Sequence, residues 1–285
     1  MKAKTPIAVL LIMLVCLSLL PSVSVQAQAQ AKGSGDASAL DQKAPKGKPS
    51  PGIATGVVAP QVTEQKYAII IGISDYAGTK NDLQYCDDDA YAFDSALLAA
   101  GWDSKNIILL IDSAANHDAI IQAIRTTKGD EGANDQVVFF YSGHGSTGVA
   151  SDGDSERKDE CIIPYECTVD TFIWDGDLKT EFAGFESQRI MFYFDSCFAG
   201  GMTDLAGTGR LVLMACGENQ MSLESSTWQN GQFTYYFVDQ GMVGHLADKD
   251  GKNGVTFEEA FDYAKAMCKS QTPVASDGFT SDMPY

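Results

Sequence analysis

Two segments rich in apolar and aromatic residues constrain the fold of this chain more than any other feature. They are Val137–Gly145 and Arg189–Cys197, and each consists of a continuous apolar run followed by small or polar residues. Continuous runs of this length are typical of strands that are buried on both faces. Each run ends next to one reactive side chain, His144 in the first segment and Cys197 in the second. Open α/β sheets place their functional sites at the carboxyl ends of such strands.

The order of the expected elements predicts an α/β fold. Apolar patterning predicts main strands over 67–73, 106–111, 136–141, 189–194 and 210–215, and a short strand over 160–164. Helices are expected over 88–100, 118–127, 175–182, 233–242 and 256–269. Strands that alternate with helices predict a three-layer α/β/α sandwich with a mostly parallel central sheet. The acidic, glycine-rich segment 145–160 is expected to be a loop outside the core.

The first 65 residues are expected to lie outside the folded domain. Residues 1–27 are typical of a signal peptide, with Lys2 and Lys4 ahead of an apolar run of about 14 residues, which is short for a membrane span. They predict a secreted, periplasmic or cell-surface protein, although an uncleaved anchor stays open. Residues 28–65 are rich in Ala, Gln, Gly, Ser, Pro and Lys, which predicts a flexible linker or pro-segment. One domain is expected over 66–285.

The charge and the cysteines narrow the classes of partner. The formal net charge is −18, which argues against nucleic acid and anionic membranes and favours divalent cations or basic polypeptides. The solubility of an exported protein would explain the same charge. Disulfides are open, because an exported chain can pair some of its cysteines but the sequence does not give the connectivity. A zinc site is not expected, since the chain has three histidines and no C-x-x-C pair.

A thiol and an imidazole at matched strand ends predict a cysteine nucleophile with its base. Small residues follow Cys197 and leave its sulfur accessible, and an imidazole nearby makes the thiolate available near neutral pH. His144 stands between two glycines, so the backbone can turn sharply there. The backbone N–H groups of Gly145 and Cys197 are expected to stabilise an oxyanion. The alternative is a buried structural cysteine and a turn histidine, which the pairing on neighbouring strands disfavours.

These two blocks resemble those of the caspase-like cysteine peptidases, and most closely those of the metacaspases and their prokaryotic relatives. In caspases a histidine lies about 50 residues before the cysteine, and the same order is found here. The resemblance covers residues 66–268 and implies a caspase-like fold, with His144 as base and Cys197 as nucleophile in peptide hydrolysis. The segment 198–200, Phe-Ala-Gly, differs from the His-Ser-Gly usual after the metacaspase cysteine and from the caspase signature.

The expected substrates are polypeptides with Arg or Lys before the scissile bond. Asp195 precedes Cys197 by two residues, which places both on one side of a strand, and a carboxylate there attracts a cationic side chain. The metacaspase pattern implies three further pocket residues, so that the predicted specificity pocket is Cys86, Asp89, Ser142 and Asp195. A capped, acid-rich helix start explains residues 86–89 equally well. If Cys86 lines the pocket, it is expected to lie outside any disulfide.

The resemblance also implies a regulatory calcium ion, because several metacaspases are activated by calcium through four aspartates. Hard oxygen ligands in flexible loops suit this ion, and a solvated acidic loop without metal is the alternative. The segment 248–259 imitates an EF-hand loop, but its glycine falls at the seventh position, and a helix cap by Thr256 and Glu259 is favoured. By local pattern the predicted ligands are Asp159, Asp175, Asp177 and Asp204, with Asp152 and Asp154 as alternatives.

The sequence and the resemblance together predict an exported cysteine endopeptidase that is stimulated by calcium. The resemblance also implies a monomer, although a dimer stays open, and self-processing, with Lys66, Lys179 or Arg189 as possible cleavage sites. No cofactor is expected for the chemistry itself. One alternative is a catalytically silent, calcium-dependent binding protein on the same fold. A second is a nucleotide-binding oxidoreductase, because 143–148 matches G-x-G-x-x-G after a strand. The acidic residues that follow do not begin a helix, which disfavours this second alternative.

Overall fold

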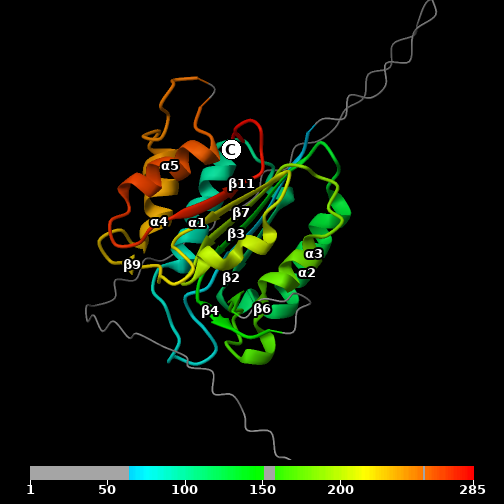
Figure 1. Cartoon of the computed structure of the whole chain (residues 1–285), viewed down its shortest axis with the longest axis vertical. Coiled ribbons are helices and arrows are strands. Elements are labelled where there is room, and N and C mark those ends of the chain that lie inside the picture. Colours follow the sequence, from blue (N-terminus) through cyan, green and yellow to red (C-terminus); the bar gives the residue numbers. More distant parts are fainter. Residues whose placement is uncertain (1–63, 151–157, 253) are drawn as a thin grey trace, which may run out of the picture. The chain divides into compact units, whose positions relative to one another are not determined.

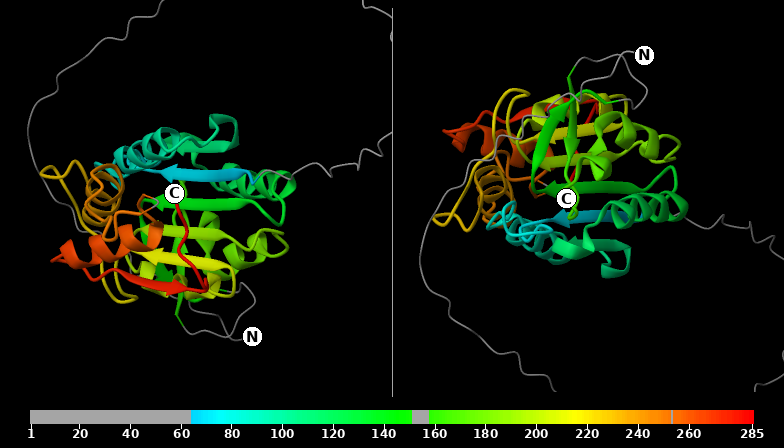
Figure 2. Two further views of the ribbon diagram at one scale, coloured as in Figure 1. Left: turned by 90° about the horizontal axis from the view of Figure 1, so that it is seen from above. Right: turned by 90° about the horizontal axis from the view of Figure 1, so that it is seen from below.

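The computed structural model describes residues 64–150, 158–252 and 254–285. Its central sheet has six strands in the order β11-β8-β7-β3-β1-β2 (Figures 1 and 2). Five of these strands are parallel, and β11 joins the edge antiparallel to β8. The strands are β1 (Lys66–Gly72), β2 (Ile107–Ile111), β3 (Gln136–Ser142), β7 (Ile190–Asp195), β8 (Arg210–Met214) and β11 (Val274–Asp277).

Helices cover both faces of this sheet, as Figure 1 shows. One buried cluster packs side chains of α2 and α3 against the sheet, and a second packs α1, α4, η5 and α5 against its other face. The prediction of a three-layer sandwich with a mostly parallel sheet is confirmed. The helices are α1 (Cys86–Ala99), α2 (His117–Asp130), α3 (Asp175–Phe182), α4 (Gln232–Thr234), which continues into the π-helix η5 (Tyr235–Val243), and α5 (Phe257–Met267).

Strand β3 shows how the sequence builds these layers. All of its residues are buried, and neighbours alternate between the two clusters, with Phe139 on one face and Phe140 on the other. Burial of each such side chain contributes about 1.5–3 kcal/mol. β3 and β7 pair in parallel, with Ser142 opposite Asp195. This register brings the residues that follow both strands to one edge of the sheet.

The segment 145–160 differs from its prediction. It contains β4 (Gly145–Gly148) and the start of β5 (Asp159–Ile162), which form a second, antiparallel sheet with β6 (Ile173–Trp174). The expectation of a loop outside the core was therefore wrong at both ends, and Asp159 and Glu160 are buried. The antiparallel strand β4 stands where a dinucleotide fold needs a helix, which argues against nucleotide binding at 143–148.

Short elements near the carboxyl terminus complete the domain. A hairpin of β9 (Glu224–Ser225) and β10 (Asn230–Gly231) was not predicted. The predicted cap of α5 is confirmed, because Glu259 N donates to Thr256 Oγ1 at 3.2 Å and Thr256 N donates to Glu259 Oε2 at 3.1 Å. All six cysteines of the described part are free thiols, Cys86 among them.

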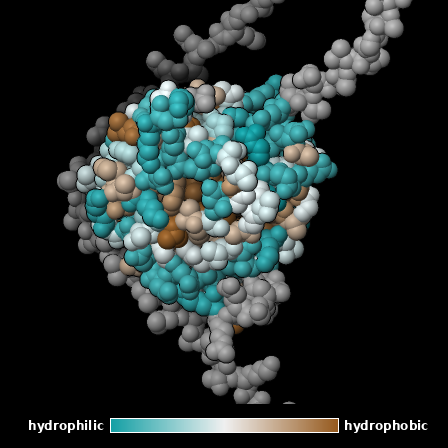
Figure 3. Space-filling model, turned by 45° about the horizontal axis from the view of Figure 1, so that its top comes forward, coloured by the Kyte–Doolittle hydropathy of each residue, from teal (hydrophilic) through white to brown (hydrophobic). Residues whose placement is uncertain are grey.

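The described surface is mostly hydrophilic on the face drawn in Figure 3, in keeping with the acidic composition. Within residues 64–150, 158–252 and 254–285, no helix is long and apolar enough to cross a membrane. The predicted signal peptide, the predicted linker up to residue 63, and the alternative ligands Asp152 and Asp154 lie outside the described residues.

Candidate active site

A cleft at the carboxyl ends of β3 and β7 gathers the predicted catalytic and specificity residues. Its cavity measures about 50 Å³. The lining includes His144, Cys197 and the whole predicted specificity pocket. The lining residues are Leu83, Cys86, Asp89, Ser142, Gly143, His144, Asp195, Ser196, Cys197, Ser222, Leu223, Glu224 and Gly231.

The imidazole of His144 is oriented by a backbone carbonyl. Its Nε2 lies 2.8 Å from the carbonyl oxygen of Asn81, in the loop between β1 and α1. A proton on Nε2 satisfies this oxygen and leaves Nδ1 as the basic nitrogen. Burial lowers the pKa of His144, against the opposite effect of the Asn81 carbonyl. The ring is therefore held in the neutral form that accepts a proton.

Cys197 lies two residues beyond the end of β7 and contacts the segment that comes after β8. Its Sγ is 3.8 Å from the carbonyl oxygen of Ser222. Burial raises the pKa of the Cys197 thiol, and the acids Asp195 and Glu224 raise it further, whereas the contact with Ser222 lowers it. The resting side chain is therefore a protonated thiol that requires a base before it can attack.

The backbones of Gly145 and Cys197 are in close contact. A Cβ atom on Gly145 would overlap the carbonyl oxygen of Cys197 and would lie 3.0 Å from Ser196 Oγ. β4 fixes this position, since Gly145 pairs with Ile162 of β5. The two residues predicted to donate N–H groups to an oxyanion thus lie side by side.

Two buried carboxylates, Asp89 and Asp195, line the cleft in the predicted specificity pocket. Asp89 of α1 accepts hydrogen bonds from Ser142 Oγ at 2.6 Å and from Gly231 N at 2.9 Å. Asp195 of β7 accepts from Ser222 Oγ at 2.5 Å, and from Thr234 N and Oγ1 at 3.0 and 2.8 Å. Side-chain and backbone donors from four segments therefore hold both carboxylates in place.

Burial and mutual repulsion act on these two acids together. Burial raises the pKa of Asp89, and the charge of Asp195 raises it further. Burial also raises the pKa of Asp195, against the hydrogen bonds from Ser222 and Thr234. Two carboxylates in one dry pocket disfavour full ionisation until a cation enters.

Glu224 is a third acid of this pocket that the sequence reasoning missed. It begins β9, and its carboxylate accepts from Gln84 N at 3.0 and 3.1 Å and from Tyr85 N at 3.0 Å. Cys86 Sγ lies 4.0 Å from the same carboxylate. No Lys or Arg stands among the described residues that line the pocket. The one signal in the sequence was an acid that follows β8 at the functional edge of the sheet.

The four predicted calcium ligands do not converge in this structure. Asp159 accepts from Ala150 N at 2.6 Å, and Asp177 caps α3 through Trp174 N at 3.4 Å. Asp204 pairs with Lys179 at 2.9 Å, and Asp175 is buried with its Oδ1 accepting from Gly176 N. Oxygen is the correct donor for calcium, but among the described residues no three of these four carboxylates bring their oxygens within 4.8 Å of one another, so they do not form a ready-made site as they are placed here.

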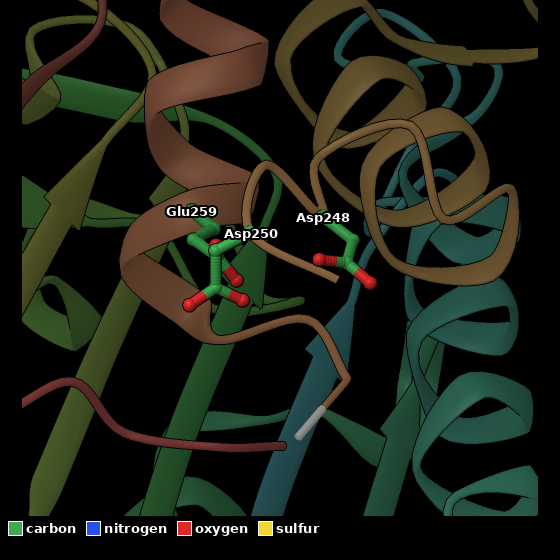
Figure 4. A group of neighbouring side chains, drawn as sticks. All are labelled: Asp248, Asp250 and Glu259. Carbon is green, nitrogen blue, oxygen red and sulfur yellow. The ribbon is translucent and has the colours of Figure 1, made fainter. Parts of the chain in front are cut away.

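A different group of acids does come together in the described part of the chain. Oxygens of Asp248, Asp250 and Glu259 all lie within 4.8 Å of one another (Figure 4). This group falls in the segment that imitates an EF-hand loop. Glu259 caps α5 there, and Asp248 and Asp250 accept hydrogen bonds from Gly251 N and Lys252 N. These are the contacts of a capping turn, as the sequence predicted.

Comparison with known proteins decides the family. The model of the caspase domain family matches residues 65–280. The chain belongs to this family. It is 34% identical to metacaspase-1 of Candida albicans over 157 residues, which are 50% of this chain and 34% of that protein. It is 32% identical to metacaspase-1 of Schizosaccharomyces pombe over 157 residues, or 50% of this chain and 36% of that protein. The predicted membership in the metacaspase-type, caspase-like cysteine peptidases is confirmed.

A solved structure supports the same fold. The protein GSU0716 from Geobacter sulfurreducens superposes with a TM-score of 0.56 at 20% identity, covering 78% of this chain and 94% of that one. The caspase-domain chain spans about a third of the length of the curated metacaspases that it matches.

Proposed function

We propose that this caspase-domain protein is an endopeptidase that cleaves after Arg or Lys, with Cys197 as nucleophile and His144 as base. The observation that carries the proposal is the set of three carboxylates, Asp89, Asp195 and Glu224, in the cavity that also contains the thiol and the imidazole. A cationic side chain in this cavity stabilises the ionised form of acids that otherwise repel one another, whereas an Asp side chain adds a further acid to the group.

The proposed reaction begins with proton transfer from the Cys197 thiol to Nδ1 of His144. The thiolate attacks the scissile carbonyl carbon, and the N–H groups of Gly145 and Cys197 stabilise the oxyanion. The imidazolium then gives its proton to the leaving amine, and the C–N bond breaks. Water, activated by the same imidazole, hydrolyses the thioester and releases the carboxylate product. Asn81 keeps Nε2 protonated, so that Nδ1 stays the reacting nitrogen throughout.

Hydrolysis of matched peptides tests the proposal. Peptides that differ in Arg, Lys or Asp before the scissile bond are compared with wild-type protein, Cys197→Ala and His144→Ala. We expect turnover of the Arg and Lys peptides only, and a loss of at least 100-fold in each variant, since a base contributes about 10²–10⁴-fold. Cleavage after Asp would refute the role of the acidic pocket. If no peptide is cleaved and iodoacetamide does not label Cys197, the chain is instead a silent binding protein.

Calcium stimulation is a further part of the proposal and rests on the sequence pattern alone. Because the four aspartates are apart in this structure, binding requires movement around α3 and the 3-10 segment η4 (Ala199–Leu205), and no catalytic step is assigned to the ion. Activity in calcium and in chelator, with Asp204→Asn as the variant and Asp170→Asn as an exposed acidic control, tests it. Equal activity in calcium and chelator would refute it.

Self-processing and export are also part of the proposal, and both rest on the sequence and on the family resemblance. Lys66 begins β1, Lys179 lies in α3, and Arg189 pairs with Glu64 at 2.7 Å, so cleavage at any of them requires local unfolding. Mass spectrometry of active protein and Cys197→Ala decides whether a cut occurs, and identical masses would refute self-processing.

Export is tested by cell fractionation and by sequencing the amino terminus of the mature chain, with cleavage expected near residue 27.

A further inference from the structure

Two buried tyrosine hydroxyls enclose the peptide groups of His144. Tyr76, from the loop after β1, accepts a hydrogen bond from His144 N at 2.7 Å. Tyr141, from β3, lies with its Oη 2.7 Å from the carbonyl oxygen of His144 and 3.0 Å from that of Ile163. The two hydroxyls are 3.4 Å apart. Both tyrosines are almost fully buried, with exposed fractions of 1% and 0%.

The protons of these hydroxyls have a defined order. Tyr76 Oη accepts the His144 N–H, and among the described hydrogen bonds Tyr141 Oη is the only acceptor left for its own proton, so we assign Tyr76 as the donor of the pair. Tyr141 accepts that proton together with the Ile163 N–H, and donates its own to the carbonyl of His144 or of Ile163. The chain of hydrogen bonds thus starts at the N–H of His144 and ends at the carbonyl of His144 or of Ile163. Hydrogen bonds in such a chain polarise one another, so the loss of one weakens the rest.

The local backbone needs this support. His144 is flanked by two glycines, and glycine allows a wider range of backbone dihedral angles than any other residue type. A Cβ atom on Gly143 would lie 2.6 and 2.7 Å from the hydroxyls of Tyr141 and Tyr76, so the glycine is what allows them to come close. The ring of Tyr76 also packs on the imidazole, with centroids 4.9 Å apart.

We propose that the hydroxyl pair of Tyr76 and Tyr141 positions His144 for proton transfer, which makes both tyrosines positioning residues of the peptidase. The inference rests on the proposed role of His144 as base. The pair fixes the main chain of His144, while the Asn81 carbonyl fixes the ring. Neither tyrosine lines the cavity, so neither takes part in recognising the substrate side chain.

The test removes single hydroxyls and keeps the rings. The variants are Tyr76→Phe, Tyr141→Phe and the double variant, with Tyr67→Phe as a matched control whose hydroxyl donates to Asp130 O at 2.9 Å on the exposed surface. We expect kcat on the Arg peptide to fall about 10- to 100-fold, as small displacements of a reacting group do, while KM changes less than about twofold. The double variant is expected to lose little more than the worse single variant, because either substitution breaks the same chain.

A second readout separates positioning from general stability and does not require turnover. The rate at which iodoacetamide labels Cys197 is followed against pH, with His144→Ala as reference. We expect the profile of Tyr76→Phe to move towards that of His144→Ala, and Tyr67→Phe to match wild type. An unchanged kcat and labelling profile in folded Tyr76→Phe would overturn the inference. The inference would also be overturned if, across the tyrosine variants, kcat falls in proportion to the melting temperature and KM rises in parallel. That result would indicate general destabilisation of the protein.

The two proposals fail in different ways. If the wild type and His144→Ala label identically, the base role of His144 fails and this inference falls with it. If wild type differs from His144→Ala but Tyr76→Phe matches wild type, the dyad stands and only the tyrosine inference fails. Should Tyr141→Phe not fold, Tyr76→Phe decides alone, since its hydroxyl contacts only His144 N and Tyr141 among the described hydrogen bonds.

Discussion

Asp89 and Asp195 face each other across Gly231. A Cβ atom on this glycine would overlap Asp195 Oδ2 and would lie 3.0 Å from Asp89 Oδ2. The two acids come from α1 and from β7, and the glycine from β10. The absence of a side chain at this one position therefore allows both carboxylates to pack against the Gly231 backbone in the predicted specificity pocket.

Gly231→Ala is expected to displace both carboxylates, because the new methyl group would overlap Asp195 Oδ2 and crowd Asp89 Oδ2. The Gly231 N–H also binds Asp89, so a shift of the backbone disturbs the same acid. We expect kcat/KM on an Arg peptide to fall at least about 10-fold, which corresponds to the loss of one charge-assisted hydrogen bond. Steady-state kinetics measure it, with Gly129→Ala of α2, where a Cβ meets no atom within 4 Å, as control. Wild-type kinetics for Gly231→Ala would contradict the pocket assignment.

The burial of Asp89 beside Asp195 predicts that the stability of the fold depends on pH. Burial, reinforced by Asp195, raises the pKa of Asp89, so the folded state holds a proton that the unfolded state releases. This contribution to stability is fully present below the unfolded pKa of about 3.9 and is lost as pH rises through the raised pKa, at about 1.4 kcal/mol for each pH unit between the two values. We expect Asp89→Asn to remove this fall and to be the more stable protein at pH 7. Denaturant unfolding between pH 4 and 8 measures it.

Loss of the proton from Asp89, which lowers the stability of the fold, is expected to strengthen the binding of an Arg substrate. A cationic side chain prefers the ionised pair, so KM for an Arg peptide is expected to decrease as pH rises through the raised pKa of Asp89. Asp89→Asn is expected to bind Arg at least about 10-fold more weakly and to lose the dependence. A variant that keeps the Arg preference of wild type would show that Asp89 plays no part in selection.

Glu224→Gln tests the acid that only the structure identified. The amide keeps one oxygen in the place of Oε2, which accepts from the N–H groups of both Gln84 and Tyr85, but removes the charge. We expect KM on Arg peptides to rise about 10-fold with kcat little changed, because the interaction acts on the substrate side chain. Glu166→Gln is the matched control, since its carboxylate also accepts a backbone N–H at the start of a helix, from His117, away from the site. An equal effect of both substitutions would indicate lost stability.

If His144 is the base, as we propose, its imidazole sets the acidic limb of the pH profile of kcat/KM. Burial lowers the pKa of this imidazole, so it is neutral over a wider range than an ordinary histidine, and the rise in kcat/KM is expected below the usual value of about 6.5. The lowered pKa stabilises the fold above 6.5, and this contribution is lost as pH falls through the folded value. A rise in kcat/KM centred above 6.5 would contradict this assignment. Rate measurements from pH 4.5 to 8 decide it.

The sheet and the meeting of His144 and Cys197 in one cleft could be predicted because both follow from short-range signals. Runs buried on both faces predict parallel strands, and the ends of parallel strands meet at one edge. The hairpin acid Glu224 and the hydroxyl of Tyr76 carry no such signal. Glu224 bonds a residue 140 positions away in sequence, and Tyr76 one that is 68 positions away. Their places depend on how distant segments pack, which no local pattern records.

Of the second sheet, the short strand predicted over 160–164 corresponds to β5, whereas β4 escaped prediction for a related reason. β4 consists of Gly-Ser-Thr-Gly, which has no apolar alternation, and it is a strand only because β5 pairs with it. Strand propensity depends on such context more than helix propensity does. The helix over 175–182 was predicted with its correct bounds, since acids in its first turn are a local signal.

Gly145→Ala asks whether this second sheet serves the catalytic centre. The new methyl group would overlap the Cys197 carbonyl, while β4 holds Gly145 against Ile162, so the two backbones must separate. If their N–H groups stabilise the oxyanion together, kcat falls about 10²–10³-fold, as for the loss of one oxyanion donor. Labelling of Cys197 by iodoacetamide has no oxyanion and is expected to keep its wild-type rate. Equal losses in turnover and labelling would instead mean that the substitution displaces the thiol itself.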